Sequence, residues 1–332
     1  MKADALPRTI QDICVQDAAR LKAALALDPR SARIEVQCLL QAILQVNRAW
    51  LLTHPEQHLN TGQQAQYAAL FERRLNGEPI AYILGEREFY GLTFKVTPDT
   101  LIPRPETELL VELVLERAPP PQPSDETTSH STKPRENGGQ VAGYPGGRRS
   151  FRVLDLGTGS GAIALSIAHA RPNVHVLACD ASPAALEVAR GNAQRLTIAN
   201  VAFVQSDWFS AIGAQRFDLI VSNPPYIAVD DPHLRQGDVR FEPHSALASG
   251  GDGLRDIRHI VTCAPAHLQP GGWLLLEHGY TQAAQVRELM RQSGFGEIFS
   301  APDLAGIERA SGGRAGSMNG GMPGWAASGE VA

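Results

Sequence analysis

Apolar residues follow two periodicities in the second half of the chain. From residue 151 onward, short apolar runs such as FRVLDL, VHVLAC and FDLIVS alternate with longer amphipathic stretches such as SPAALEVARGNAQRL. Apolar runs of strand length that alternate with helical patterns are typical of a mostly parallel sheet covered by helices on both faces. The pattern therefore predicts an α/β, doubly wound, Rossmann-like domain over residues 106–309.

The first part of the chain has a helical pattern instead. Residues 1–78 include IEVQCLLQAI and QAQYAALFERRLNG, which repeat apolar side chains at helical spacing, and Gly77 is suited to a helix end. In REFYGLTFKVTP two β-rich runs meet at Gly91, so residues 79–105 are expected to form a β-hairpin linker. We expect a small helical domain that docks a substrate, although a purely packing role remains open.

Two stretches do not have the pattern of a packed element. Residues 119–150 are rich in Pro, Gly, Ser and Thr and have almost no apolar periodicity, so a disordered insertion is expected. Residues 310–332, ASGGRAGSMNGGMPGWAASGEVA, are rich in glycine, which weakens strands. We therefore expect a disordered tail, no final strand and an exposed sheet edge.

Composition and charge narrow the class of protein. The net charge of −5 argues against a protein whose main function is to bind the phosphates of nucleic acids. The four cysteines have no C-x-x-C spacing, so neither a metal site nor a disulfide framework is predicted. The N-terminus lacks the apolar core of a signal peptide, and no run of 18 apolar residues occurs. We expect a monomeric, cytoplasmic protein that binds no membrane.

A glycine-rich turn follows the first strand of the predicted sheet. In VLDLGTGSGAIAL, Gly157, Gly159 and Gly161 let the backbone approach a ligand, and the following helix offers N–H groups at its N-terminus. The turn alone also satisfies the loose dinucleotide pattern G-x-G-x-x-A. Asp180 ends the next strand, where a carboxylate can accept from ribose hydroxyls, although it could also cap the following helix.

The third strand ends with Asp207 and Trp208. Asp207 could accept a hydrogen bond from an adenine amino group, and the Trp208 ring could lie against the adenine. Burial of Trp208 as an ordinary core residue is the competing interpretation.

The stretch SNPPYI, after a fourth strand, predicts a rigid amide clamp. The Asn223 side-chain oxygen and the Pro224 carbonyl could accept the two N–H groups of a planar amide or aromatic amine. Pro225 adds no competing donor, and the Tyr226 ring can stack on the flat group. Orientation of this weak nucleophile would supply the rate. The electrophile that fits a glycine-loop, ribose-binding site is the sulfonium methyl of S-adenosylmethionine, which needs no metal.

These stretches, together with FYGLTFKVTPDTLIPRPETE and FEPHSALASGGDGL, resemble the peptide chain release factor N(5)-glutamine methyltransferases (HemK/PrmC) over about residues 1–118 and 151–309. The resemblance implies a seven-stranded methyltransferase domain behind a helical domain, and methylation of the glutamine in the Gly-Gly-Gln motif of release factors. It implies a glutamine clamp of Asn223, Pro224, Pro225 and Tyr226, with Asn223, Pro224 and Tyr226 catalytic. The cofactor contacts that it implies are Asp155, Gly157, Thr158, Gly159, Ser160, Gly161, Asp180, Asp207, Trp208 and Asn223.

Other activities remain open on the sequence. Enzymes that methylate a glutamine of a ribosomal protein or the N6 of adenine in DNA use the same Asn-Pro-Pro-aromatic motif. The net negative charge of the chain disfavours DNA as the substrate. A non-catalytic S-adenosylmethionine-binding module is a further alternative, which the intact clamp argues against. Gly138-Gly139-Gln140 reproduces the substrate tripeptide within the insertion, and we expect a coincidence rather than self-methylation.

Overall fold

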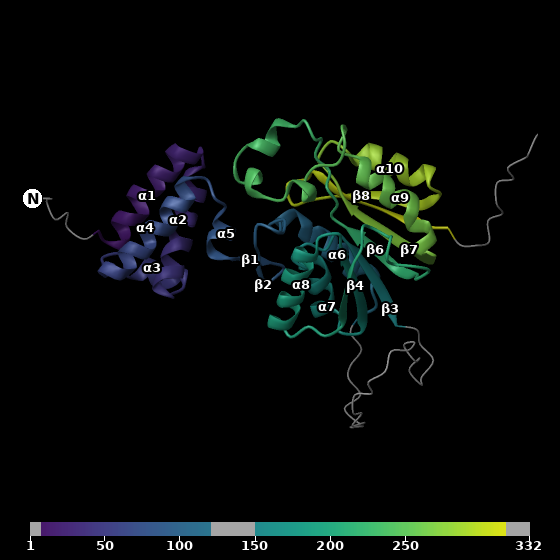
Figure 1. Cartoon of the computed structure of the whole chain (residues 1–332), viewed down its shortest axis with the longest axis horizontal. Coiled ribbons are helices and arrows are strands. Elements are labelled where there is room, and N and C mark those ends of the chain that lie inside the picture. The colour runs from purple at the N-terminus through teal and green to yellow at the C-terminus, as the bar shows by residue number, and fades with distance from the viewer. Residues whose placement is uncertain (1–7, 121–149, 317–332) are drawn as a thin grey trace, which may run out of the picture. The chain divides into compact units, whose positions relative to one another are not determined.

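The computed structural model describes residues 8–120 and 150–316 (Figure 1). The chain divides into two compact units. The first, here the helical unit, comprises Met1–Pro103 and Ile227–Gly253, and the second, here the sheet unit, comprises Arg104–Tyr226 and Leu254–Ala332. Residues 227–253, which the sequence placed in the methyltransferase domain, therefore group with the helical unit. The predicted insertion, including Gln140, lies outside the described residues apart from its ends.

Helices make up most of the helical unit. They are α1 (Ile10–Leu25), α2 (Pro29–Leu44), α3 (Arg48–Thr53), α4 (Thr61–Leu75) and α5 (Ile80–Leu84). Side-chain caps fix where they begin: Thr9 forms a capping box with Asp12 before α1, and Asn60 forms one with Gln63 before α4. Their apolar faces meet in one core, in which Leu39 is fully buried.

The predicted hairpin follows these helices. Strands β1 (Glu86–Phe89) and β2 (Leu92–Lys95) pair antiparallel. The two turn residues, Tyr90 and Gly91, have φ angles of 50° and 74°, as a type I′ turn requires. The hairpin prediction is thus confirmed, although the linker range also contains the short helix α5.

The returning segment 227–253 is held to the helices by buried polar contacts. It contains the 3₁₀ turns η2 (Pro232–Arg235), η3 (Asp238–Phe241) and η4 (His244–Ala246). Arg74, only 1% exposed, pairs with Glu35 at 2.7 Å and with Asp238 at 2.9 Å. The Glu242 carboxylate accepts from the Ile102 N–H at 2.9 Å.

Seven strands form one sheet within the described part of the sheet unit, in the order β5-β4-β3-β6-β7-β9-β8. Their bounds are β3 (Phe151–Leu156), β4 (Val174–Asp180), β5 (Val201–Gln205), β6 (Phe217–Ser222), β7 (Leu268–Glu277), β8 (Phe295–Pro302) and β9 (Glu308–Ala315). The connecting helices are η1 (Pro105–Thr107), α6 (Glu108–Arg117), α7 (Ala162–Ala170), α8 (Pro183–Arg195), α9 (Arg255–His267) and α10 (Ala283–Gln292). Strands β3 to β7 pair in parallel, which confirms the Rossmann-like prediction.

Helices cover both faces of this sheet (Figure 1). Leu154 and Leu156 of β3 share a core with Ile257 of α9 and Met290 of α10. Because strand side chains alternate, Asp155 points to the other face. The continuous apolar strands seen in the sequence follow from burial on both sides.

The chain reverses its direction of winding between β3 and β6, and this switch point places two loops together. Leu156 pairs with Ser222 at the last step of both strands, and the Ser222 hydroxyl donates to the Leu156 carbonyl at 2.7 Å. Leu276 pairs with Ser222 from the other side, so Glu277 lies beside Asn223. Ligands of open α/β sheets bind at such a point, outside the carboxyl ends of the strands.

The prediction of a strandless tail is wrong for residues 310–315. They belong to β9, which pairs antiparallel with both β7 and β8. The glycines suit this strand because a Cβ on Gly312 would lie 2.5 Å from the Phe299 ring and 2.7 Å from the Leu275 side chain. Residues 317–332 lie outside the described part of the chain.

Candidate functional site

The glycine-rich loop has a backbone that only glycine adopts readily. Gly157, Gly159 and Gly161 have φ angles of 72°, 55° and 85°. A Cβ on Gly161 would lie 2.9 Å from Leu165, whereas no heavy atom lies within 4 Å of the Cβ position of Gly159 in the described residues. The loop therefore leaves open space over Gly159, at the switch point.

Four N–H groups of this loop, those of Gly157, Thr158, Gly159 and Gly161, are bonded within the protein. The Cys179 carbonyl accepts from Gly157 and Thr158, both at 2.9 Å, and the Asp180 carboxylate accepts from Gly159 at 2.9 Å. A dinucleotide pyrophosphate would need such donors. These bonded N–H groups are therefore not available to a pyrophosphate.

Asp180 lies at the end of β4 and is half-buried. Its Oδ1 accepts from the Ser182 N–H at 2.9 Å, while Ser182 itself caps α8. The proposed helix cap is thus Ser182 and not Asp180. Burial raises the pKa of Asp180. Each carboxylate oxygen can accept more than one hydrogen bond, so acceptor capacity remains for ribose hydroxyls.

Three residues that were predicted to contact the cofactor, Asp155, Thr158 and Ser160, stabilise the loop through buried hydrogen bonds. Asp155 is fully buried and accepts from the Thr158 hydroxyl at 2.7 Å. Burial raises the pKa of Asp155 to about 7. Ser160 is buried, and its carbonyl accepts from the Asn192 amide at 2.9 Å.

Trp208 packs in the core and also borders the glycine-rich loop, so both interpretations that the sequence left open apply in part. The side chain is half-buried and packs against the sheet core, but its ring also lies 3.6 Å from the Cβ position of Gly157. Its φ of 48° is unusual for a bulky residue. Asp207 beside it is exposed. The ring therefore lies against the glycine loop, with the Asp207 carboxylate in solvent.

The Asn-Pro-Pro-Tyr segment continues directly from β6. Asn223 is half-buried, and its Nδ2 donates to the Thr107 hydroxyl at 3.1 Å. Pro224 is buried, and Pro225 is half-buried. The Tyr226 hydroxyl donates to Glu277 at 3.2 Å. The segment is therefore anchored by side chains at both ends.

Sequence reasoning missed two residues of this site, Thr107 and Glu277. Thr107 is 4% exposed and donates to Glu277 Oε2 at 2.7 Å. Burial raises the pKa of Glu277, which is 3% exposed, to about 7. A carboxylate that ends the apolar run WLLLE was a possible signal for Glu277. Thr107 lies in the stretch FYGLTFKVTPDTLIPRPETE, but its side-chain hydrogen bonds are to residues more than 100 positions away in sequence, so the local pattern does not indicate its role.

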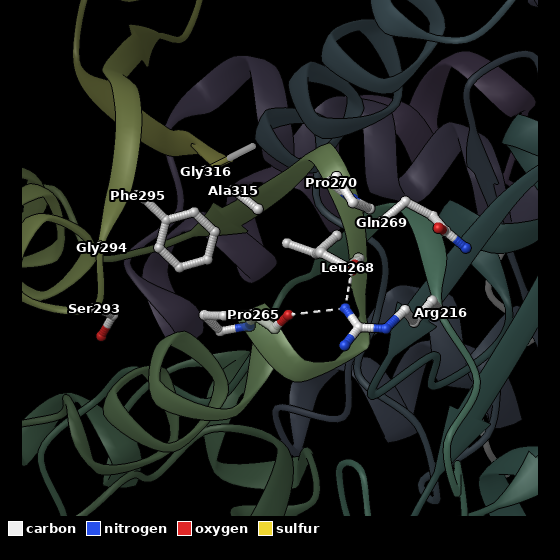
Figure 2. Close-up of a pocket in the computed structure, with 10 residues that line it drawn as sticks. All are labelled: Arg216, Pro265, Leu268, Gln269, Pro270, Ser293, Gly294, Phe295, Ala315 and Gly316. Carbon is white, nitrogen blue, oxygen red and sulfur yellow. Dashed lines mark hydrogen bonds between the residues drawn. The ribbon is translucent and has the colours of Figure 1, made fainter. Parts of the chain in front are cut away.

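A separate cavity of about 190 Å³ lies at the opposite end of the strands. Figure 2 shows Arg216, Leu268 and Phe295 around it, and Arg216 donates to the Leu268 carbonyl at 2.6 Å. Leu268 begins β7, whereas Glu277 ends it. The cavity is therefore distinct from the switch-point site.

Within residues 8–120 and 150–316, no three His, Cys, Asp or Glu side chains are grouped as a metal site would need. No helix in these ranges has the length and apolar character needed to span a bilayer.

Comparison with known proteins places the chain in a class. Residues 146–252 match the family model of the methyltransferase small domain, and residues 18–85 match that of the PrmC N-terminal domain. Fold and match together define the chain as a methyltransferase whose methyl donor is S-adenosylmethionine.

Relatives over most of the chain identify the family. A release factor glutamine methyltransferase from Bordetella pertussis is 49% identical over 87% of this chain and 97% of its own length. The protein of that name from Burkholderia pseudomallei is 48% identical over 90% of this chain and 95% of its own. The chain belongs to the release factor glutamine methyltransferase family, as the sequence motifs indicated.

A crystal structure of a release factor-specific protein-(glutamine-N5) methyltransferase from Alicyclobacillus acidocaldarius is 30% identical over 67% of this chain and 99% of that chain, with a TM-score of 0.36. At this TM-score the superposition adds nothing to the family assignment.

Proposed function

We propose that this chain transfers a methyl group from S-adenosylmethionine to the side-chain amide nitrogen of the glutamine in the Gly-Gly-Gln motif of peptide chain release factors. The names of the relatives support the substrate. The observation that carries the chemistry is the anchored Asn223, whose Nδ2 is bonded to Thr107 and whose Oδ1 is left as an acceptor beside Pro224.

In this proposal the clamp orients the substrate amide. The Asn223 oxygen and the Pro224 carbonyl accept its two N–H groups, which turns the out-of-plane electron density of the nitrogen toward the cofactor. S-adenosylmethionine, when bound, supplies an electrophilic methyl group on a sulfonium. The N–CH₃ bond would form as the methyl–sulfur bond breaks, which leaves the sulfur as a neutral thioether, and the alkylated nitrogen then loses one proton to solvent. The same two acceptors stabilise the positive charge on the nitrogen until that proton leaves. The Tyr226 ring stacks on the amide plane, and Pro225 keeps the segment rigid.

Cofactor binding is assigned in the same proposal to the loop residues Gly157, Thr158, Gly159, Ser160 and Gly161, with Asp155 bracing the loop from below. The open space over Gly159 supports this assignment.

The cofactor's ribose and adenine are assigned to groups beside the loop. Asp180 has remaining acceptor capacity for the ribose hydroxyls. Trp208 offers a ring face to the adenine, and Asp207 an exposed carboxylate to its amino group. Asn223 contacts both cofactor and substrate.

The finer partner predictions remain part of the proposal. We propose that the helical unit docks the release factor, that the enzyme works as a monomer without binding nucleic acid, and that it acts in the cytoplasm, where translation terminates.

The experiment offers tritiated S-adenosylmethionine with a release factor, its Gln→Ala variant in the Gly-Gly-Gln motif, a ribosomal protein and duplex DNA side by side. Label in the unmodified release factor alone is expected. Label in DNA or in the ribosomal protein, with none in the release factor, would overturn the proposal. A loss of label in the Gln→Ala release factor assigns the methyl group to that side chain.

A further inference from the structure

A chain of three buried or half-buried polar groups runs along the carboxyl edge of the sheet to the clamp. Glu277 Oε2 accepts from the Thr107 hydroxyl at 2.7 Å, and the Thr107 oxygen lies 3.1 Å from Asn223 Nδ2. Glu277 and Thr107 are 3% and 4% exposed. The sheet register places Glu277 beside Asn223, and η1 supplies Thr107. Water therefore has little access to the bond between Thr107 and Glu277.

The direction of these bonds follows from the number of protons. An ionised carboxylate can only accept, so Thr107 must donate its single hydroxyl proton to Glu277. The Thr107 oxygen is then left only as an acceptor. Asn223 must therefore turn its NH₂ group toward Thr107, so that its Oδ1 points away from Thr107.

We propose that Thr107 and Glu277 are positioning residues that fix the amide orientation of Asn223, so that its oxygen and not its NH₂ group faces the substrate. This inference rests on the proposed function, because only an acceptor at that position can bind the N–H of a glutamine amide. An Asn223 amide turned by 180° would present a donor to a donor.

Protonation of Glu277 removes the constraint on the orientation of the Asn223 amide. A protonated carboxyl can donate to Thr107, whose own proton is then free to turn toward Asn223 and allow the flipped amide. Burial raises the pKa of Glu277 to about 7, while the bonds from Thr107 and Tyr226 act to lower it.

Three other titratable side chains are relevant to the charge of Glu277: two shift its pKa, and the third stays neutral near pH 7. The positive charge of Arg309 on β9 acts to lower its pKa, and the negative charge of Glu106 in η1 acts to raise it. The neighbouring His278 is fully buried, and burial lowers its pKa, so it remains neutral near pH 7. Of Glu277, Arg309, Glu106 and His278, the carboxyl of Glu277 is therefore the group expected to change charge near pH 7, and methyl transfer should fall as the pH is lowered through about 7.

The kinetic test compares Thr107→Val and Glu277→Gln with the conservative variant Thr107→Ser. The first two should lower kcat for release factor methylation about tenfold, with the KM for S-adenosylmethionine unchanged, whereas Thr107→Ser should stay within about threefold of the wild type. The acidic limb of the kcat profile should be present in the wild type and absent in Glu277→Gln.

The double variant Thr107→Val/Glu277→Gln should be no slower than the slower single variant, because both changes remove the same constraint on the Asn223 amide orientation. Ser166→Ala removes a buried hydroxyl that has no hydrogen-bond partner in the described residues, so it serves as the matched control and should keep the wild-type kcat.

Wild-type kcat and an unchanged pH profile in both Thr107→Val and Glu277→Gln would overturn the inference, as would fully additive losses in the double variant. If Thr107→Val does not fold, the pH profile of Glu277→Gln decides alone.

A second measurement separates this inference from the proposed function. The Asn223 side-chain NH₂ protons, followed by NMR, should exchange at least tenfold faster in Thr107→Val than in Thr107→Ser, whether or not the protein methylates a release factor. Equal exchange would overturn the positioning chain. An inactive wild type with slow exchange would instead contradict only the proposed function.

Discussion

A single added methyl group at Gly312 should destabilise the sheet unit. The new Cβ would lie 2.5 Å and 2.7 Å from two atoms of the Phe299 ring and 2.7 Å from a methyl of Leu275. Leu275 is fully buried, and the Phe299 ring packs edge-on against Trp273 and under the Arg117 guanidinium, so neither can move freely.

Overpacking of this kind costs about 1–3 kcal/mol, and we expect the upper half of that range because two side chains must shift. At about 2–4 °C per kcal/mol for a domain of this size, Gly312→Ala should lower the Tm by about 5–10 °C. The assay is differential scanning calorimetry of the full chain.

Gly296→Ala is the matched control for this change. Gly296 also lies in the sheet, on β8, but no heavy atom of the described residues is within 4 Å of its Cβ position. Its Tm should stay within about 2 °C of the wild type, since surface changes usually cost under about 0.5 kcal/mol. If the Gly312→Ala variant had the same Tm as the Gly296→Ala control, this would contradict the placement of β9 between β7 and β8.

Three further changes test other parts of the account. Asp180→Ala should weaken S-adenosylmethionine binding at least tenfold in titration calorimetry while the circular dichroism spectrum is unchanged, because it removes the carboxylate proposed to accept from the ribose hydroxyls. Arg74→Met should lower the free energy of unfolding of the helical unit by about 3 kcal/mol in urea titrations, since it leaves the partly buried Glu35 carboxylate without its cation. Burial raises the pKa of Asp155 to about 7, above its value of about 3.9 in unfolded chains, so stability falls as the pH rises between those values. Asp155→Asn should therefore raise the Tm relative to the wild type more at pH 8 than at pH 5.

The sequence predicted the parts of the fold that local pattern determines. The apolar runs marked the parallel strands because strands buried on both faces read as continuous hydrophobic segments. The Gly157 loop and the Asn223 segment were both expected at strand ends. Register explains why they meet: Leu156 and Ser222 are paired at the edge of the sheet.

The failures have physical causes in tertiary context. The glycines of β9 predicted no strand because strand propensity was read without its neighbours, yet Phe299 and Leu275 occupy the space that a side chain at Gly312 would need. Thr107 and Glu277 were missed because the hydrogen bond between them joins residues that are 170 positions apart.

The most direct test of the central claim is the single-turnover rate of methyl transfer to a release factor by Asn223→Ala, with the cofactor Kd measured on the same preparation. Asn173→Ala serves as the control for an asparagine away from the site. The expected rate is at least about 100-fold below the wild type, as for loss of one preorganised polar group in an active site, with the Kd for S-adenosylmethionine within about threefold. A wild-type rate in Asn223→Ala would contradict the claim that this side chain holds the substrate amide.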